Sequence, residues 1–149
     1  MTENYFGLTD TGKERTNNED TFIAQPAADQ KLIIAAVIDG VGGYAGGEVA
    51  ADIARDTIIA RLNSRGDNPG QTLAQTLHAA NNKIYTERTK GKGNEQMACV
   101  CSVAVADMQQ NRFYYAHVGD TRIYLLRDQS LVKISTDHSF VGFLEDSGR

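Results

Sequence analysis

Acidic side chains that follow predicted strands are the residues of this chain best suited to chemistry. Asp39 ends the apolar run Leu32–Ile38 and is followed by five glycines between positions 40 and 47. A buried carboxylate is costly unless a positive group or hydrogen bonds compensate it, and glycines let a ligand approach the backbone closely. Three explanations fit this pattern: a metal ion, a phosphate-binding turn, or a structural hydrogen-bond network.

A second acidic group lies upstream. Glu19 and Asp20 come directly before a predicted strand, and Arg15 lies four residues before Glu19. If the strands of Asp20 and Asp39 are neighbours, their carboxylates meet at one end of a sheet, where hard cations neutralise them. Oxygen ligands without His or Cys favour magnesium or manganese, and an arginine beside the ions suits a bidentate hold on phosphate. Together these residues predict phosphoryl chemistry.

Each group also has a simpler structural interpretation. Residues 17–20 can form a solvated turn, Gly119–Arg122 a structural turn with an internal ion pair, and Asp137 the cap of a helix. The segment Gly40–Ala45 also fits the dinucleotide fingerprint G-x-G-x-x-A. That function needs an acidic residue at the end of a second strand about 20 positions later. Because Ile58–Leu62 continues a helical pattern instead, the sequence does not favour dinucleotide binding.

The predicted elements that position these groups change in character along the chain. Apolar residues recur at helical spacing in the middle, and the last four strands form a predicted meander of hairpins. A strand at Met97–Asp107 that is apolar on both faces predicts stacked sheets with helices outside. The predicted strands are Tyr5–Thr9, Thr21–Gln25, Lys31–Ile38, Met97–Asp107, Arg112–Val118, Thr121–Arg127 and Leu131–Ile134; the predicted helices are 46–63, 72–88 and a short helix opening at 137–139.

Composition narrows the class of protein. The 149 residues, 41% of them hydrophobic and 23% charged, predict one globular domain spanning 1–149. The net charge of −4 and the absence of a Lys/Arg-rich run argue against nucleic acid as a partner. No signal peptide or membrane-spanning run is recognisable, so we expect a cytoplasmic protein. Cys99 and Cys101 point to one face of a predicted strand, and we interpret them as buried, inert thiols.

Four sequence motifs, taken in order, resemble those of the metal-dependent protein serine/threonine phosphatases of type 2C in their bacterial form. The turn GKERTNNED is similar to the family's G-x-x-R-x-x-N-E-D, VIDGVGG to D-G-[HM]-G-G, and VGDTRIYLL to V-G-D-S-R-x-Y. The segment TDHSFVGFLEDSG resembles the family's next segment. The resemblance implies an α+β fold: a sandwich of two antiparallel sheets flanked by helices, with two magnesium or manganese ions at one end.

The resemblance also implies roles for individual residues. Asp39 would bridge both ions and the Gly40 carbonyl would ligate one, while Glu19 and Asp20 would act mainly through metal-bound waters. Arg15 would grip the substrate phosphate, and a metal-activated water would hydrolyse the phosphomonoester of a phosphoprotein in signalling.

Later motifs imply two further assignments. Asp137 matches a position that helps to hold a third, looser ion in bacterial members. Asp120 and Arg122 are interpreted as structural.

The chain departs from the family pattern at three points. Val41 stands where eukaryotic members carry a histidine proposed as general acid, and residues 98–100 replace the family's G-T-T, which removes hydroxyls close to the site. The family's two further metal-binding aspartates, in S-D-G and D-N motifs that follow these four segments, have no counterpart in this chain. We therefore expect an N-terminal portion of a phosphatase catalytic domain, incomplete at the C-terminus, inactive alone and able to self-associate. The alternative is a pseudophosphatase, a module that binds a phosphoprotein or regulator.

Overall fold

The computed structural model describes residues 4–41, 46–64, 68–91 and 95–148. A four-stranded sheet in the order β1-β2-β3-β4 forms the centre, with every neighbouring pair antiparallel, and β5 and β6 form a separate antiparallel hairpin. The elements are β1 Asp20–Pro26, β2 Leu32–Val41, α1 Gly47–Asn63, α2 Pro69–Arg88, β3 Ala98–Asp107, β4 Arg112–Val118, β5 Tyr124–Arg127, β6 Ser130–Lys133 and α3 Phe140–Asp146.

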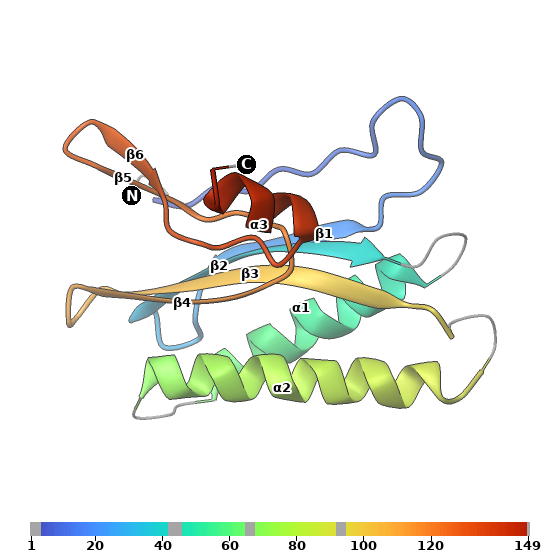
Figure 1. Ribbon diagram of the computed structural model, residues 1–149. Helices are drawn as coiled ribbons and strands as arrows, with labels where there is room; N and C mark the ends of the chain where they lie inside the picture. The colour runs from blue at the N-terminus through green and yellow to red at the C-terminus, as the bar shows by residue number, and fades with distance from the viewer. Residues whose placement is uncertain (1–3, 42–45, 65–67, 92–94, 149) are drawn as a thin grey trace.

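The elements form layers, which confirms the α+β class (Figure 1). Helices α1 and α2 cover one face of the four-stranded sheet, and the β5–β6 hairpin and α3 lie on the other side. The core lies between the helices and the sheet. Alternate residues of β2 and β3, such as Ile34, Ile38 and Val103, are fully buried there against Ile58 of α1 and Leu73 of α2. Alternate side chains of a strand share one face, and side chains three to four residues apart share one face of a helix, so the apolar residues of both meet in this core.

Local sequence signals set the start of each helix. Asn68 caps α2, because its side chain accepts a hydrogen bond from the amide of Gln71, and Pro69 occupies the first turn, where its missing N–H costs nothing. Ser139 caps α3 in the same way through the amide of Gly142. Helix α1 instead follows Gly46, whose φ of 106° is left-handed and which provides no side-chain cap.

The face of the sheet opposite α1 and α2, called here the open face, carries exposed apolar side chains. Val37 is 53% exposed, and Phe113 and Tyr115, which stack on each other, are each 46% exposed. The hydroxyl of Tyr115 donates to the carbonyl of Ile134, so the segment after β6 crosses part of this face. The open face is therefore apolar and only partly covered.

Three sequence predictions are wrong in detail. Tyr5–Thr9 is not a strand, and the strand predicted at Thr121–Arg127 begins only at Tyr124. The predicted meander is broken, because β4 and β5 belong to different sheets. The dinucleotide fingerprint, Gly40–Ala45, lies partly outside the described residues, because 42–45 are not among them. Strand β2 is antiparallel to both of its neighbours, so it does not belong to the parallel βαβ unit that dinucleotide binding requires.

The remaining predictions concern the cysteines and the membrane. Cys101 is buried and Cys99 half-buried, and burial raises their pKa values to about 12 and about 11. Both thiols are therefore protonated near neutrality, as inert core cysteines are. Among the described residues, none of the helices has the length and apolar character needed to cross a bilayer.

Candidate metal centre

The acidic site is built on the pairing of β1 with β2. Asp20 and Asp39 are direct partners in the antiparallel register, so their side chains lie on the same face, the open face, at one end of the sheet. The pKa of Asp39 is raised, first by burial, then by the charges of Asp20 and Asp120, by a hydrogen bond shared with Asp20, and by the charge of Glu19. The charges of three other carboxylates therefore act on Asp39, which favours a bound cation beside it.

Glycines make this crowding possible. The amide of Gly40 donates to the carbonyl of Glu19 at 3.1 Å. A Cβ at Gly40 would stand 2.3 Å from the carbonyl oxygen of Gly47 and 2.4 Å from that of Glu19. A Cβ at Gly47 would stand 2.8–3.1 Å from the Glu19 carboxylate. Only glycine fits at position 40, where the clash is with backbone atoms, whereas a side chain at position 47 would have to displace the Glu19 carboxylate. That carboxylate lies against the first residue of α1, where helix N–H groups favour negative charge.

An open pocket of about 240 Å³ collects most of the predicted site residues. Arg15, Glu19, Asp20, Asp39 and Gly40 all line it, with side chains of the same polar turn around them. The structure therefore brings the candidate phosphate-binding arginine and the candidate metal ligands to one place, although Arg15 and Asp39 are 24 residues apart in sequence. Their convergence depends on the pairing of β1 with β2 and on the turn that precedes β1.

Asp120 does not line the acidic pocket, but its charge acts on Asp39, which the interpretation of Asp120 as structural did not anticipate. Gly119 has a left-handed φ of 103° and packs so closely on Val100 that an added Cβ would stand 2.2 Å from the valine side chain. Val100 is the β3 partner of Asp39. The turn after β4 therefore carries Asp120 close enough to Asp39 for its charge to raise the pKa of Asp39. The sequence signal that could have revealed it is the acidic residue in the turn after β4, a strand that lies two positions from β2 in the sheet.

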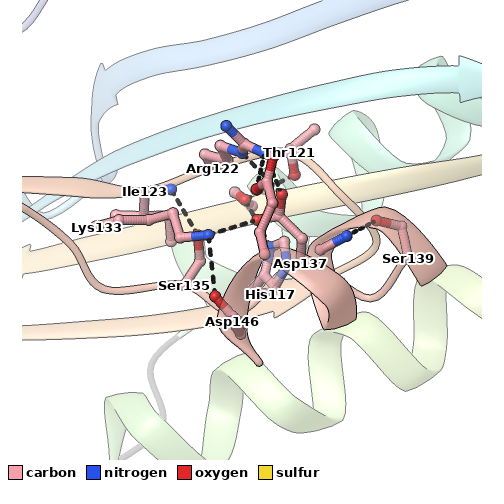
Figure 2. Close-up of polar contacts among 12 residues, drawn as sticks. His117, Thr121, Arg122, Ile123, Lys133, Ser135, Asp137, Ser139 and Asp146 are labelled. Atoms are coloured by element: carbon pink, nitrogen blue, oxygen red, sulfur yellow. Dashed lines mark hydrogen bonds and ion pairs between the residues drawn. The ribbon is translucent and has the colours of Figure 1, made fainter. Parts of the chain in front are cut away.

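Asp137, the predicted ligand of a third ion, lies instead in an ion-pair cluster (Figure 2). Its side chain is 2% exposed; its carboxylate is 2.6 Å from a terminal guanidinium nitrogen of Arg122 and 3.5 Å from Nζ of Lys133. The hydrogen bond from Arg122 is the main cause that lowers the pKa of Asp137. Asp137 does not line the acidic pocket, and Ser139 rather than Asp137 caps α3. Arg122 pairs with Asp137, which corrects the predicted internal pair with Asp120.

The residues present fit a hard cation but do not complete a site for one. The donors that converge are carboxylate and carbonyl oxygens, the ligands preferred by magnesium and manganese. Gly40 lets the backbones of Glu19 and Gly47 pack closely against β2. Within the described part of the chain, no group of three or more His, Cys, Asp or Glu side chains is placed to hold a metal ion. Asp20 and Asp39, as direct strand partners, supply two carboxylates side by side.

Comparison with known proteins identifies the class. The family described as "Protein phosphatase 2C" matches residues 11–143, and the chain belongs to this family.

Individual relatives sharpen the identification. The chain is 36% identical over 149 residues to the serine/threonine protein phosphatase PstP of Mycobacterium tuberculosis, covering 97% of this chain and 27% of PstP. It is 31% identical over 152 residues to the protein phosphatase PhpP of Streptococcus pneumoniae, covering 95% of this chain and 58% of PhpP. The chain thus spans between about a quarter and three fifths of these curated relatives.

Among solved structures, the catalytic domain of PstP in complex with two manganese ions superposes with a TM-score of 0.86 at 31% identity. That match covers 97% of this chain and 60% of the solved chain. The layered fold described above is therefore the fold of a family member, over the portion that the two chains share.

Proposed function

We propose that this chain is the N-terminal portion of the catalytic domain of a manganese- or magnesium-dependent protein serine/threonine phosphatase. The observation that carries the proposal is the crowding of Asp20, Asp39 and Asp120, with the Glu19 carboxylate nearby, beside a pocket that Arg15 also lines. Such like charges are stable together when a divalent cation neutralises them. The manganese found in the PstP catalytic domain supports the same assignment.

The residues divide into two groups by role. Asp39, Asp20 and the Gly40 carbonyl would hold the ion, with Glu19 beside them at the start of α1. A bound ion would supply an activated water and would stabilise the charge that develops on the phosphoryl group. Arg15 would bind the phosphate of the substrate, because a guanidinium presents paired donors to phosphate oxygens. The likeness to serine/threonine protein phosphatases supports a phosphoprotein carrying phosphoserine or phosphothreonine as the partner.

We also propose that this portion of the catalytic domain, by itself, does not hydrolyse phosphate esters. A two-ion centre needs more fixed ligands than the Asp20–Asp39 pair supplies, and about two fifths of the solved PstP chain has no counterpart here. A pseudophosphatase that binds a phosphoprotein through Arg15 is the second candidate, favoured by the absence, among the described residues, of a three-ligand group. A cytoplasmic location remains part of the proposal, based on the sequence alone.

The test is a manganese titration of the 149-residue chain by calorimetry. We expect weak binding of one ion, and we expect Asp39→Asn to reduce the affinity at least tenfold, about 1.4 kcal/mol. Asp128→Asn is the matched control: it removes the same charge from the β5–β6 turn, where a left-handed φ of 50° suits asparagine. An unchanged affinity in Asp39→Asn would remove Asp39 from the proposed centre, and equal losses in both variants would indicate a general charge effect.

A further inference from the structure

The segment that precedes the first turn is attached to the rest of the fold at two points. A Cβ at Gly7 would overlap the ring of Phe22 in β1, so the segment passes directly over that ring. Phe22 is the strand partner of Val37, and both side chains lie on the open face. In Figure 1 the segment accordingly runs on the side of the sheet away from α1 and α2. The second point is the hydroxyl of Thr9, which accepts a hydrogen bond of 2.9 Å from Nδ2 of Asn18.

Asn18 makes another hydrogen bond, which determines the orientation of its side-chain amide. Its Oδ1 accepts from the backbone amide of Asp20, the first residue of β1, at 3.1 Å. Because a backbone N–H can only donate, the atom that faces it is the oxygen, and the NH2 group is left to donate to Thr9. One side chain therefore joins the N-terminal segment, the turn that carries Arg15 and the start of β1.

The attached segment supplies part of the wall of the acidic pocket. Asp10, which directly follows Thr9, lines this pocket together with Arg15. The amide of Gly12 donates to Oδ1 of Asp10 at 2.7 Å, which orients the carboxylate within its turn. The segment lies outside the helices and strands, so its position depends on the two contacts described above.

Asp10 has a charge that the proposed metal centre does not use. In that centre, Asp20 and Asp39 hold the ion, with Glu19 beside them. Arg15 binds the phosphate of the substrate. The carboxylate of Asp10 has neither role, and beside a bound phosphopeptide it would attract a lysine or arginine of that peptide.

We infer that Asn18 is a positioning residue, which fixes Asp10 in the wall of the pocket through its bond to Thr9. The pocket therefore prefers phosphopeptides that carry a basic residue beside the phosphorylated one. This preference rests on the proposed function, whereas the position of Asp10 does not.

The position of the segment is tested without substrate or metal. Backbone order parameters from nitrogen-15 NMR relaxation separate rigid residues, at about 0.85, from flexible ones, below about 0.6. We expect residues 9–11 to be rigid in the wild type. Thr9→Val and Asn18→Ala should both make them flexible, because each variant removes one partner of the same hydrogen bond. Thr9→Ser keeps the hydroxyl and should behave as the wild type does.

Two further measurements separate the two hydrogen bonds of Asn18 and provide a control. Hydrogen exchange of the Asp20 amide should become about fivefold faster in Asn18→Ala, which loses Oδ1, and should not change in Thr9→Val. Asn17→Ala is the matched control. Asn17 lines the same pocket, but its side chain has no hydrogen bond to another residue of the described chain. Its removal should change neither the order parameters nor the exchange rate.

The substrate preference is tested with two phosphothreonine peptides that differ in one flanking residue, lysine or glutamine. With manganese present, the wild-type chain should bind the lysine peptide about threefold more tightly, as expected for one exposed ion pair. Asp10→Asn keeps an acceptor for the Gly12 amide but removes the charge, and should abolish the preference. Thr9→Val should abolish most of it, whereas Thr9→Ser and Asn17→Ala should keep it.

Either of two results would overturn the inference. The first is a rigid segment in both Thr9→Val and Asn18→Ala, or an equal loss of order in Asn17→Ala. The second is an unchanged preference for the lysine peptide in Asp10→Asn or in Thr9→Val.

The same measurements distinguish this inference from the proposed function. If the wild type binds both peptides equally well while Asp39→Asn loses manganese, the preference is wrong and the metal centre stands. If the wild type binds neither manganese nor the peptides while the order parameters behave as expected, the proposed function is wrong and the positioning role of Asn18 stands.

Discussion

Replacing Gly40 by alanine directly perturbs the close packing of β2 against the start of α1 and the Glu19 turn. The added Cβ would stand 2.3 Å from the Gly47 carbonyl oxygen and 2.4 Å from that of Glu19. Both atoms belong to the backbone, so neither can rotate away, and β2 must separate from the start of α1 and from the Glu19 turn. Gly40 is not among the residues with positive φ, so the destabilising part of the effect is steric and includes no backbone strain.

The expected size follows from two opposing terms. Overpacking a well-packed site costs about 1–3 kcal/mol, and contact with two backbone atoms places this case in the upper half of that range. Alanine also restricts the unfolded chain, which stabilises the protein by about 0.4–1 kcal/mol. We therefore expect Gly40→Ala to lower the free energy of unfolding by about 2 kcal/mol. For a chain of this length that corresponds to a decrease in Tm of about 4–8 °C.

Urea denaturation of the metal-free chain, followed by circular dichroism, measures the free energy of unfolding. Calorimetry measures manganese affinity in parallel. Manganese affinity should fall as well, because the shift displaces the Glu19 and Asp39 backbones together. Gly148→Ala is the control: nothing lies within 4 Å of its added Cβ, and only its φ of 69° opposes the change, at a cost of about 1–2 kcal/mol with unchanged manganese binding. A Gly40→Ala variant within about 0.5 kcal/mol of wild type, with full manganese affinity, would refute the packing argument.

Four other predictions follow from the same structure. Arg15→Ala should weaken binding of a phosphopeptide, and in a longer, active protein it should raise KM more than it lowers kcat; a loss of manganese affinity with unchanged phosphopeptide binding would contradict its role. The 149-residue chain should not hydrolyse p-nitrophenyl phosphate at millimolar manganese, and turnover that Asp39→Asn abolishes would show that the site is complete. Its apolar open face, with Val37, Phe113 and Tyr115 exposed, should drive self-association, and a single monomeric species at all concentrations in analytical ultracentrifugation would argue against this. The pKa of Cys99 is about 11, against 9 for a free thiol, so its thiolate is about a hundredfold scarcer at pH 8. Labelling of Cys99 by a disulfide reagent should therefore be slow at pH 8 and should accelerate as the pH rises toward 11. Fast labelling at pH 8 would contradict the burial of this thiol.

Local patterns in the sequence were sufficient to predict the elements of the core. The helical spacing of apolar residues located α1 and α2 within a few residues of their observed bounds, and the bounds of β4 were predicted without error. Asp39 at the end of an apolar run was recognised as a site residue because the cost of burying a carboxylate can be judged from its neighbours in sequence. The ordered motifs that include Arg15 and Asp39 were also sufficient to indicate the family.

Only the tertiary structure decided how the groups around Gly119–Arg122 are partnered. Sequence reasoning paired Asp120 with Arg122, because the two charges are two residues apart. In the fold, Arg122 forms an ion pair with Asp137, 15 residues later, and the charge of Asp120 acts on Asp39, 81 residues earlier. A turn leaves its side chains free to point in different directions, so their partners depend on which distant segments pack beside it. The periodicity of helices and strands contains no information about that choice.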